Sequence, residues 1–333
     1  MSYLDKEKIK RAEDTLSLNF EITRLYATYL EHCPELITKE MIDTLCEDGT
    51  ISKSDALTAL VTEILGLDEE RSQKEKRLVR EYIRPSVRLL DKSRYTENKY
   101  YKTIVIDNVK DGAWELKKES YPPYRAMICG DLMFGSDLSE VPPLGFFDEE
   151  FFFPAVLEDG NEWMTLTPVD LDTCDEAIER AHGKTITFGL GLGYYAFMVS
   201  EKAEVESITV IEKSEKVISL FKKHILPQFN HPEKVRIINA DAFEYLENEM
   251  CAERYDYAFV DIWRDASDGA PVYERFKRLE HLTGCTKFDY WIENFLISRL
   301  RAQRYAELAE ALSSELEDSI SYEEFIKRLT EVI

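Results

Sequence analysis

A glycine-rich turn between two apolar runs constrains this chain more than any other feature. Residues 185–188 form a short apolar run, and the sequence Gly-Leu-Gly-Leu-Gly follows directly at 189–193. A helical pattern begins at Tyr194, and a second apolar run at 207–211 ends in Glu212. This order of strand, glycine turn, helix and strand predicts the first β-α-β unit of a doubly wound, mostly parallel sheet. Glycines suit the turn because a ligand can approach a backbone that has no Cβ atoms.

The spacing of the glycines indicates the kind of ligand. A dinucleotide-binding turn reads G-x-G-x-x-G, whereas Gly189, Gly191 and Gly193 give G-x-G-x-G, followed by the bulky Tyr194. This spacing favours a nucleoside without phosphates over a pyrophosphate on the helix N-terminus. A tight turn that binds nothing is the alternative. The acid Glu212, at the end of the second strand, suits the two hydroxyl donors of a ribose.

Two further apolar runs also end in acids. The run at 235–240 leads into Asp241, and the run at 255–260 leads into Asp261. In a doubly wound sheet the carboxyl ends of the strands meet at the edge that binds ligands. We expect the fourth strand beside the first, on the side opposite the second. A short fifth strand is expected at 285–291, and no sixth or seventh strand is evident.

As a set, these motifs resemble the class I S-adenosylmethionine-dependent methyltransferases, and more narrowly their spermidine-synthase-like branch. The resemblance covers about residues 165–280 and implies a Rossmann-like fold with S-adenosylmethionine as the cofactor. It implies that Asp261 lies at the reaction centre, as the candidate catalytic residue. The cofactor-binding residues that it implies are Gly189, Gly191, Gly193, Glu212, Lys213, Asp241, Ala242, Phe243 and Asp261.

The chain departs from this family at one position. Many members carry an acid two residues before the first glycine, and this chain has Thr187 there. The resemblance therefore does not say how the amino group of the methionine is held.

Candidate residues for the acceptor come from three places. One is the loop after Asp261, which is rich in acids and suits an amine or cationic acceptor through charge and ring-face attraction. The others are the segment before the first strand and the start of the helix after the glycine turn. A solvated loop and a hairpin that packs its tryptophan are the alternative interpretations. The candidates are Trp163, Thr167, Tyr195, Trp263, Asp265 and Asp268.

These features favour a methyltransferase whose acceptor the sequence does not identify. The second hypothesis is an aminopropyltransferase that uses decarboxylated S-adenosylmethionine, since acids after the fourth strand could grip an amine. The chain lacks the aspartate-glutamate-tyrosine-histidine stretch that such enzymes carry before the glycine turn. The third hypothesis is a non-catalytic protein that keeps the fold and binds a partner through its helical N-terminal part.

The pattern of the chain predicts a mixed α/β architecture in four parts. These are a helical N-terminal domain at 1–95, a connecting region with β-hairpins at 96–168, a Rossmann-like S-adenosylmethionine-binding domain at 169–292, and C-terminal helices at 293–333. Hairpin turns are expected at Asp111-Gly112 and Asp159-Gly160, the first preceded by a strand at 101–107. Helices are expected to begin at Ser54-Asp55, Asp172 and Pro271.

Composition narrows the partners. The chain has 42 Lys and Arg against 65 Asp and Glu, a formal net charge of -23, which repels phosphate backbones and disfavours a nucleic-acid substrate. We expect a small-molecule substrate and leave a homodimer open. The six cysteines and five histidines show no metal-site spacing. No apolar run is long enough for a membrane span and the N-terminus lacks a signal core, so a cytoplasmic location is expected.

Overall fold

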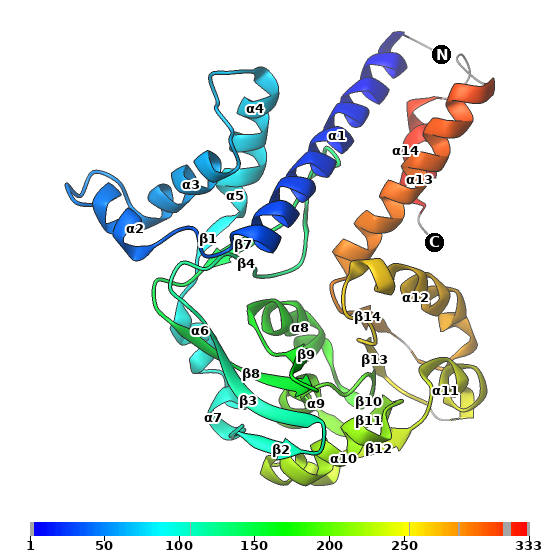
Figure 1. Ribbon diagram of the computed structural model, residues 1–333. Helices are drawn as coiled ribbons and strands as arrows, with labels where there is room; N and C mark the ends of the chain where they lie inside the picture. Colours follow the sequence, from blue (N-terminus) through cyan, green and yellow to red (C-terminus); the bar gives the residue numbers. More distant parts are fainter. Residues whose placement is uncertain (1–2, 107, 253, 286, 316–320, 332–333) are drawn as a thin grey trace. The chain divides into compact units, whose positions relative to one another are not determined.

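The computed structural model divides the chain into two compact units (Figure 1). The residues that it describes are 3–106, 108–252, 254–285, 287–315 and 321–331. The first unit, called here the helical unit, comprises Met1–Leu90, Pro122–Glu150 and Asn294–Ile333. The second, called the sheet unit, comprises Asp91–Tyr121 and Phe151–Glu293. The segment 96–168, expected to form one connecting region, thus contributes to both units.

A five-stranded sheet with every neighbouring pair parallel forms the centre of the sheet unit. Its strand order is β12-β11-β10-β13-β14. The strands are β10 (Gly183–Phe188), β11 (Val205–Glu212), β12 (Val235–Asn239), β13 (Tyr257–Val260) and β14 (Phe288–Tyr290). The fourth strand of the sequence prediction, β13, pairs with β10 on the side opposite β11, as expected. Within the described residues the sheet ends at β14, so it is shorter than a seven-stranded one.

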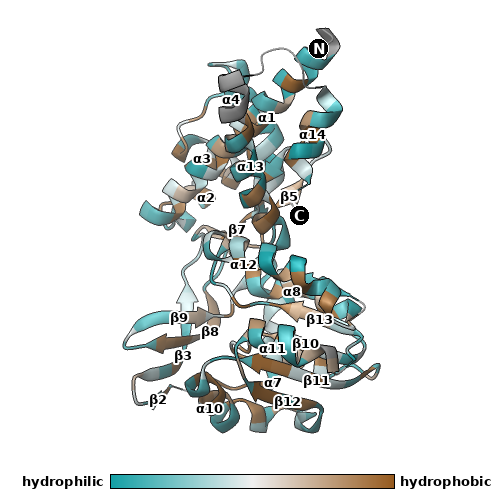
Figure 2. Cartoon of the chain, turned by 90° about the vertical axis from the view of Figure 1, so that its right-hand side faces the viewer, coloured by the Kyte–Doolittle hydropathy of each residue, from teal (hydrophilic) through white to brown (hydrophobic). Residues whose placement is uncertain are grey.

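Parallel strands with both faces covered read as continuous apolar runs, and the central strands fit this rule. Ile186, Phe188, Ile208 and Val210 are all fully buried. Figure 2 shows strands of this sheet in brown, whereas α10 mixes brown and teal, as an amphipathic covering helix should. The helices of this part are α8 (Pro168–Arg180), α9 (Tyr194–Ser200), α10 (Glu215–His224), α11 (Ala242–Asn248) and α12 (Ala266–Leu279). Short 3₁₀ helices lie at Leu226–Gln228, Pro232–Lys234, Met250–Ala252 and Glu280–Leu282.

An antiparallel sheet of order β2-β3-β8-β9 belongs to the same unit. Its strands are β2 (Val109–Asp111), β3 (Trp114–Tyr121), β8 (Phe151–Glu158) and β9 (Asn161–Thr165). Both expected hairpin turns are confirmed, but the strand before the first turn is Val109–Asp111 and not the expected 101–107. At the second turn Asp159 and Gly160 have φ of 50° and 79°, the left-handed pair that a tight two-residue hairpin requires.

The strand expected at 101–107 is wrong. The chain instead forms two short helices, α6 (Lys92–Thr96) and α7 (Lys99–Thr103). Asn98 begins α7, because its side-chain oxygen accepts a hydrogen bond from the Tyr100 N–H at 2.8 Å. This cap and the complete burial of Tyr100 outweigh the β-branched composition. Residues 104–106 form no strand, and residue 107 lies outside the described residues.

Three helix starts also differ from expectation, each because a cap lies earlier. Helix α12 begins at Ala266 with Pro271 inside it, α8 begins at Pro168 after Thr167, and Ser52 caps α3 in place of Ser54. In α3 and α12 the side-chain oxygen of the cap residue accepts a backbone N–H of the first turn, and in α8 the Asp170 carboxylate accepts the N–H of Thr167, which fixes each helix N-terminus.

The helical unit combines two groups of helices with small strands. Its helices are α1 (Tyr3–His32), α2 (Lys39–Leu45), α3 (Lys53–Ile64), α4 (Gln73–Arg77), a π-helix at Leu78–Ile83, α5 (Arg84–Ser86), α13 (Glu293–Glu315) and α14 (Tyr322–Thr330). Its strands are β1 (Val87–Leu89), β4 (Met127–Ile128), β5 (Met133–Phe134), β6 (Glu140–Val141) and β7 (Leu144–Phe146). Strand β7 lies between β1 and β4, parallel to β1 and antiparallel to β4.

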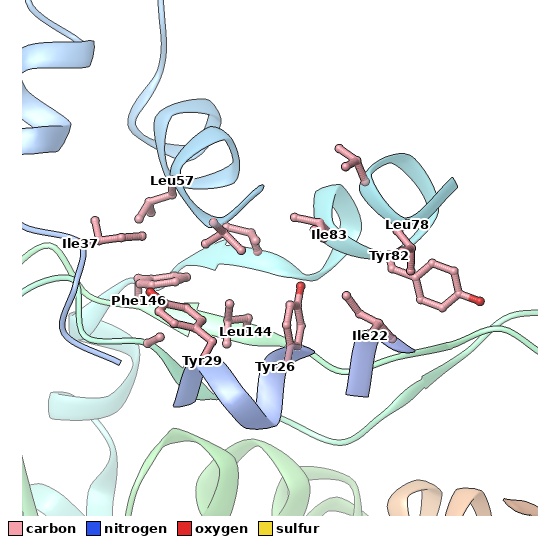
Figure 3. Packing of buried hydrophobic residues seen from close by; sticks show 14 of the residues in the cluster. Ile22, Tyr26, Tyr29, Ile37, Leu57, Leu78, Tyr82, Ile83, Leu144 and Phe146 are labelled. Atoms are coloured by element: carbon pink, nitrogen blue, oxygen red, sulfur yellow. The ribbon is translucent and has the colours of Figure 1, made fainter. Parts of the chain in front are cut away.

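Tyrosine and aliphatic side chains fill the core of this unit (Figure 3). Tyr26 and Tyr29 of α1 are buried against Leu144 and Phe146 of β7. The Tyr26 hydroxyl bonds to Ser86, whereas the buried hydroxyl of Tyr29 has no hydrogen-bond partner among the described residues. Among the described residues of this core we find no group of side chains that could bind a metal, and its apolar side chains serve packing.

Candidate functional site

The glycine turn joins β10 to α9 at the point where strand order reverses. Gly189, Gly191 and Gly193 have φ of 99°, 51° and 75°, in the region that favours glycine. A Cβ on Gly189 would overlap the carbonyl oxygen of Asp261, and one on Gly193 would overlap the ring of Phe221. These two glycines are therefore required by packing inside the fold.

Gly191 differs from the other two. A Cβ there would meet only the Sδ and Cε atoms of Met164, the far end of a flexible side chain. The backbone at Gly191 is thus covered by a group that can move. A nucleoside ligand could therefore approach the backbone in the middle of the turn if the Met164 side chain moved.

Helix α7 supports the far end of the turn. The Tyr100 hydroxyl donates to the carbonyl oxygen of Leu192 at 2.6 Å. The Tyr100 ring also makes edge contacts with Tyr194 and Phe197 at centroid distances of 5.6 and 5.5 Å. Helix α7, which overlaps the start of the segment expected as a strand, therefore holds the glycine turn from outside the sheet.

Glu212 lies against the same turn from the end of β11. Its Oε2 accepts a hydrogen bond from the Leu190 N–H at 3.2 Å, and its Oε1 accepts one from the Ser214 N–H at 2.7 Å. The side chain is half-buried. A carboxylate offers about four lone-pair sites, so this one keeps capacity for the hydroxyl donors of a ribose.

Asp241 and Lys213 lie beside Glu212. Asp241 caps α11, and its Oδ2 pairs with the Lys213 Nζ at 3.0 Å. The hydrogen bond from Lys213, with backbone N–H donors, lowers the pKa of Asp241. The Asn239 amide donates to the carbonyl oxygens of Glu212 and Lys213, which joins the ends of β11 and β12. Three residues predicted to bind the cofactor are thus brought together here.

Ala242 and Phe243 follow in the first turn of α11. Ala242 is buried. The Phe243 ring packs on Phe276 at 4.8 Å, and the Arg275 guanidinium lies 3.7 Å from its centroid. The Phe243 ring is thus held in place by two side chains of α12.

A pocket opens on the other side of the glycine turn, toward β13. Its empty volume is about 440 Å³ when the solvent space at its open mouth is counted in. It is lined by the turn, by α8, α9 and β13, and by the residue after β14. The lining residues are Met164, Leu166, Asp170, Cys174, Thr187, Gly189, Leu190, Tyr194, Tyr195, Ala196, Phe259, Asp261 and Trp291.

Two carboxyl groups share this pocket. Asp261 is partly accessible, and no hydrogen bond to its carboxyl is found among the described residues. Burial, and then the charge of Asp170, raise the pKa of Asp261 to about 8. Burial also raises the pKa of Asp170, to about 6, against hydrogen bonds from Thr167 that lower it.

The acceptor candidates before and after the glycine turn fall in different places. Tyr195 lines the pocket and stacks on Phe259 at 4.4 Å. Thr167 donates from its N–H and its hydroxyl to Asp170 at 2.7 and 2.9 Å. Trp163 packs edge-on against Trp114 at 5.2 Å, outside the pocket.

The three candidates of the loop after β13 are not among the residues that line the pocket. Trp263 is buried and stacks on Tyr290 at 6.4 Å, with no partner for its Nε1 among the described residues. Asp265 and Asp268 form the capping box of α12, in which Asp265 accepts from the Ser267 N–H at 2.7 Å. This explains why two acids stand at that spacing.

Sequence reasoning missed Asp170, Met164 and Trp291. The stretch Thr167-Pro-Val-Asp170 carries a recognisable helix-start pattern, with a threonine cap, proline at the first position and an acid at the third. Met164 neighbours Trp163 on a strand, so the two side chains point to opposite faces. Choosing the larger aromatic selected the face away from the pocket. Trp291 follows a strand end, as Asp261 does.

Other kinds of site leave no trace in the part of the chain that the structure describes. There, no three His, Cys, Asp or Glu side chains are grouped to hold a metal ion. None of the described helices combines the length and apolarity that crossing a bilayer would require.

Comparisons with known proteins give partial likenesses only. No family model and no curated protein matches the sequence. Spermidine synthase from Thermotoga maritima aligns with 15% identity and a TM-score of 0.33, over 46% of this chain and 58% of that one. An O-methyltransferase candidate from Klebsiella pneumoniae aligns with 18% identity and a TM-score of 0.23, over 28% of this chain and 41% of that one. A spermidine synthase in complex with the transition-state analogue AdoDATO aligns with 19% identity and a TM-score of 0.26, over 34% of this chain and 43% of that one. At these scores the likenesses carry no argument about activity.

Proposed function

We propose that the chain is an S-adenosylmethionine-dependent methyltransferase that acts on a small-molecule acceptor. One arrangement supports this proposal above all. The glycine turn after β10 lies between an acid at the end of β11 and an acid at the end of β13. The glycine spacing favours a ligand without phosphates. An acid on each side of the turn suits a ligand with a ribose at one end and a cationic chain at the other.

The chain's own residues would divide the binding task along the sheet edge. Glu212 would accept hydrogen bonds from the ribose hydroxyls, and Asp241 with Lys213 would border the adenine. Gly191 would allow the ligand to lie close to the turn once Met164 moves. When bound, the cofactor would supply a methyl group already activated on a sulfonium.

Asp261 would serve the acceptor. As the pH approaches 8 and Asp261 ionises, its carboxylate can accept a hydrogen bond from an N–H or O–H of the acceptor, which orients the attacking lone pair. The pKa of Asp261, near 8, makes it a stronger proton acceptor than an ordinary carboxylate. The loop after β13 would also contact the acceptor, through Asp265, Asp268 and Trp263.

An aminopropyltransferase is the second candidate, because two carboxyl groups in one pocket also suit an amine substrate. Calorimetry with S-adenosylmethionine, its decarboxylated form and NAD separates the candidates. Tighter binding of S-adenosylmethionine supports the methyltransferase, and tighter binding of the decarboxylated form supports aminopropyl transfer. Binding of none contradicts both and favours a non-catalytic role. A methylation screen over metabolites would then identify the acceptor.

A further inference from the structure

We propose that Asp170, in the first turn of α8, holds the cationic amino group of the cofactor's amino-acid chain. The inference rests on the proposed function and deepens it, because it assigns a binding residue at the end of the ligand opposite the ribose. Asp170 is absent from the residues that the sequence patterns pointed to. Its place in the pocket is what brings it into the site.

The direction of the ligand follows from the sheet. If the ribose lies on Glu212 at the end of β11, the chain attached to its 5′ carbon must cross the glycine turn toward β10 and β13. The pocket lies on that side, and Thr187 of β10 and Asp261 after β13 line it together with Asp170. The amino-acid chain of the ligand would therefore extend toward α8.

Asp170 is the carboxylate best prepared to stay ionised there. Its Oδ2 accepts two hydrogen bonds from Thr167, at 2.7 and 2.9 Å, and such donors favour the charged form. Besides these two bonds, only the backbone N–H of Asp170 itself contributes a hydrogen bond that lowers the pKa of this carboxyl, so at least one of its roughly four lone-pair sites stays open. Burial raises the pKa of both carboxyl groups, and only that of Asp170 is lowered again by hydrogen bonds from Thr167, so Asp170 is the one of the two that ionises first as pH rises.

Charge complementarity then favours an ammonium group. The residues that line the pocket in the described structure include no lysine, arginine or histidine. An ammonium group has three donors and no acceptor, so it needs an acceptor oxygen that is both charged and unused. Asp170 supplies one, held in place by the cap of α8.

The test measures binding rather than activity. Calorimetry compares three probes: S-adenosylhomocysteine, the analogue in which hydrogen replaces its amino group, and 5′-methylthioadenosine, which lacks the amino-acid chain. The protein is the full chain, as the parent and as Asp170→Asn and Asp170→Gln. Asparagine keeps the oxygen that Thr167 requires, and glutamine at this position also completes a capping box. Asp175→Asn is the matched control, since Asp175 is exposed on the same helix and pairs with Arg94 at 3.1 Å.

We expect the parent and Asp175→Asn to bind S-adenosylhomocysteine about ten- to a hundredfold more tightly than the deaminated analogue, the range for a charge-assisted hydrogen bond. In both Asp170 variants this ratio should fall to about one, with the affinity for 5′-methylthioadenosine unchanged. Melting temperatures confirm that the variants fold.

Two results would overturn the assignment and leave the proposed function standing. The ratio could persist in both Asp170 variants, or all three probes could weaken equally, which would mean a structural role. A parent protein that binds none of the three probes would instead refute the proposed function, and this inference with it.

Discussion

The carboxylate of Glu212 accepts a hydrogen bond from the backbone N–H of Leu190 at 3.2 Å. The end of β11 is therefore tied to the glycine turn before any ligand arrives. A second bond, from the Ser214 N–H, fixes the other oxygen and leaves the side chain little rotational freedom. An acceptor that is already positioned loses little conformational entropy when a ligand binds.

The first prediction concerns this residue. Glu212→Ala should weaken S-adenosylhomocysteine binding about ten- to a hundredfold, because a charge-assisted hydrogen bond contributes roughly 1.5–3 kcal/mol. A 2′-deoxy analogue should lose affinity in the parent and lose less in the variant. Glu206→Ala, on an exposed position of the same strand, is the control. Equal losses in parent and variant, measured by calorimetry, would refute the ribose contact.

The second prediction contrasts two glycines of the turn. Gly191→Ala should cost about 1–2 kcal/mol of stability, the cost of a left-handed backbone for an L-residue, and should weaken cofactor binding. Gly189→Ala should destabilise the fold by more, because its Cβ would overlap the carbonyl oxygen of Asp261. Urea denaturation measures both. Equal loss of stability in the two variants would contradict the distinct roles of the two positions.

The third prediction concerns the support from α7. Tyr100→Phe leaves the carbonyl oxygen of Leu192 without its buried donor, so it should cost roughly 1–3 kcal/mol of stability. Cofactor affinity should fall with it, since the turn loses an anchor. Tyr273→Phe is a matched control, because its hydroxyl donates to Glu293 at 2.7 Å and neither residue lines the pocket. The support role fails if the two variants reduce affinity equally.

The fourth prediction is a pH dependence of stability. The pKa of Asp261 is raised to about 8 in the folded chain, above its unfolded value of about 4. The folded state therefore binds the proton more tightly, and this stabilisation is present below pH 4 and lost as pH rises through about 8. Relative to the parent, Asp261→Asn should gain stability between pH 5 and pH 9 in urea titrations. Parallel curves for the two proteins would show that Asp261 is not held neutral.

The fifth prediction separates two roles for the acids after β13. Asp265→Ala should cost roughly 0.5–2 kcal/mol through loss of the α12 cap. Asp265→Asn keeps the cap and removes only the charge. If the loop binds a cationic acceptor, Asp265→Asn should raise KM at low salt while the melting temperature stays near that of the parent. An unchanged KM would leave Asp265 with the capping role alone.

The sequence predicted the parallel sheet well because its central strands β10, β11 and β13 carry buried apolar runs. The order of β10, β11 and β13 followed from the general topology of such sheets, and the glycine turn was found at its expected place. Hydrophobic periodicity and the turn residues between apolar runs are local properties of the sequence, so the strands could be predicted without knowing any tertiary contact.

The errors came where a cap or a distant contact decides the local structure. Residues 99–103 have a strand-like composition, yet they form a helix because Asn98 caps it. A distant contact also stabilises this helix, since the Tyr100 hydroxyl donates a hydrogen bond to the Leu192 carbonyl oxygen. Asp170 could not be placed in the pocket from sequence, because only the packing of α8 beside the turn brings it near Asp261. The acids at 265 and 268 attracted attention for their charge, although their spacing equally suits a capping box.

The chain passes between its two units at residues 90–91, 121–122, 150–151 and 293–294, so neither unit is a continuous stretch. This has a consequence for synthesis on the ribosome. A nascent chain completes the sheet unit first, while the helical unit still lacks α14, whose Phe325 and Leu329 are buried with Ala12 of α1. Helix α1 must therefore wait for α14, which is made later. For the same reason no single cut yields either unit: a fragment of residues 169–292 would lose the strands β8 and β9 and the Tyr100 anchor of the glycine turn.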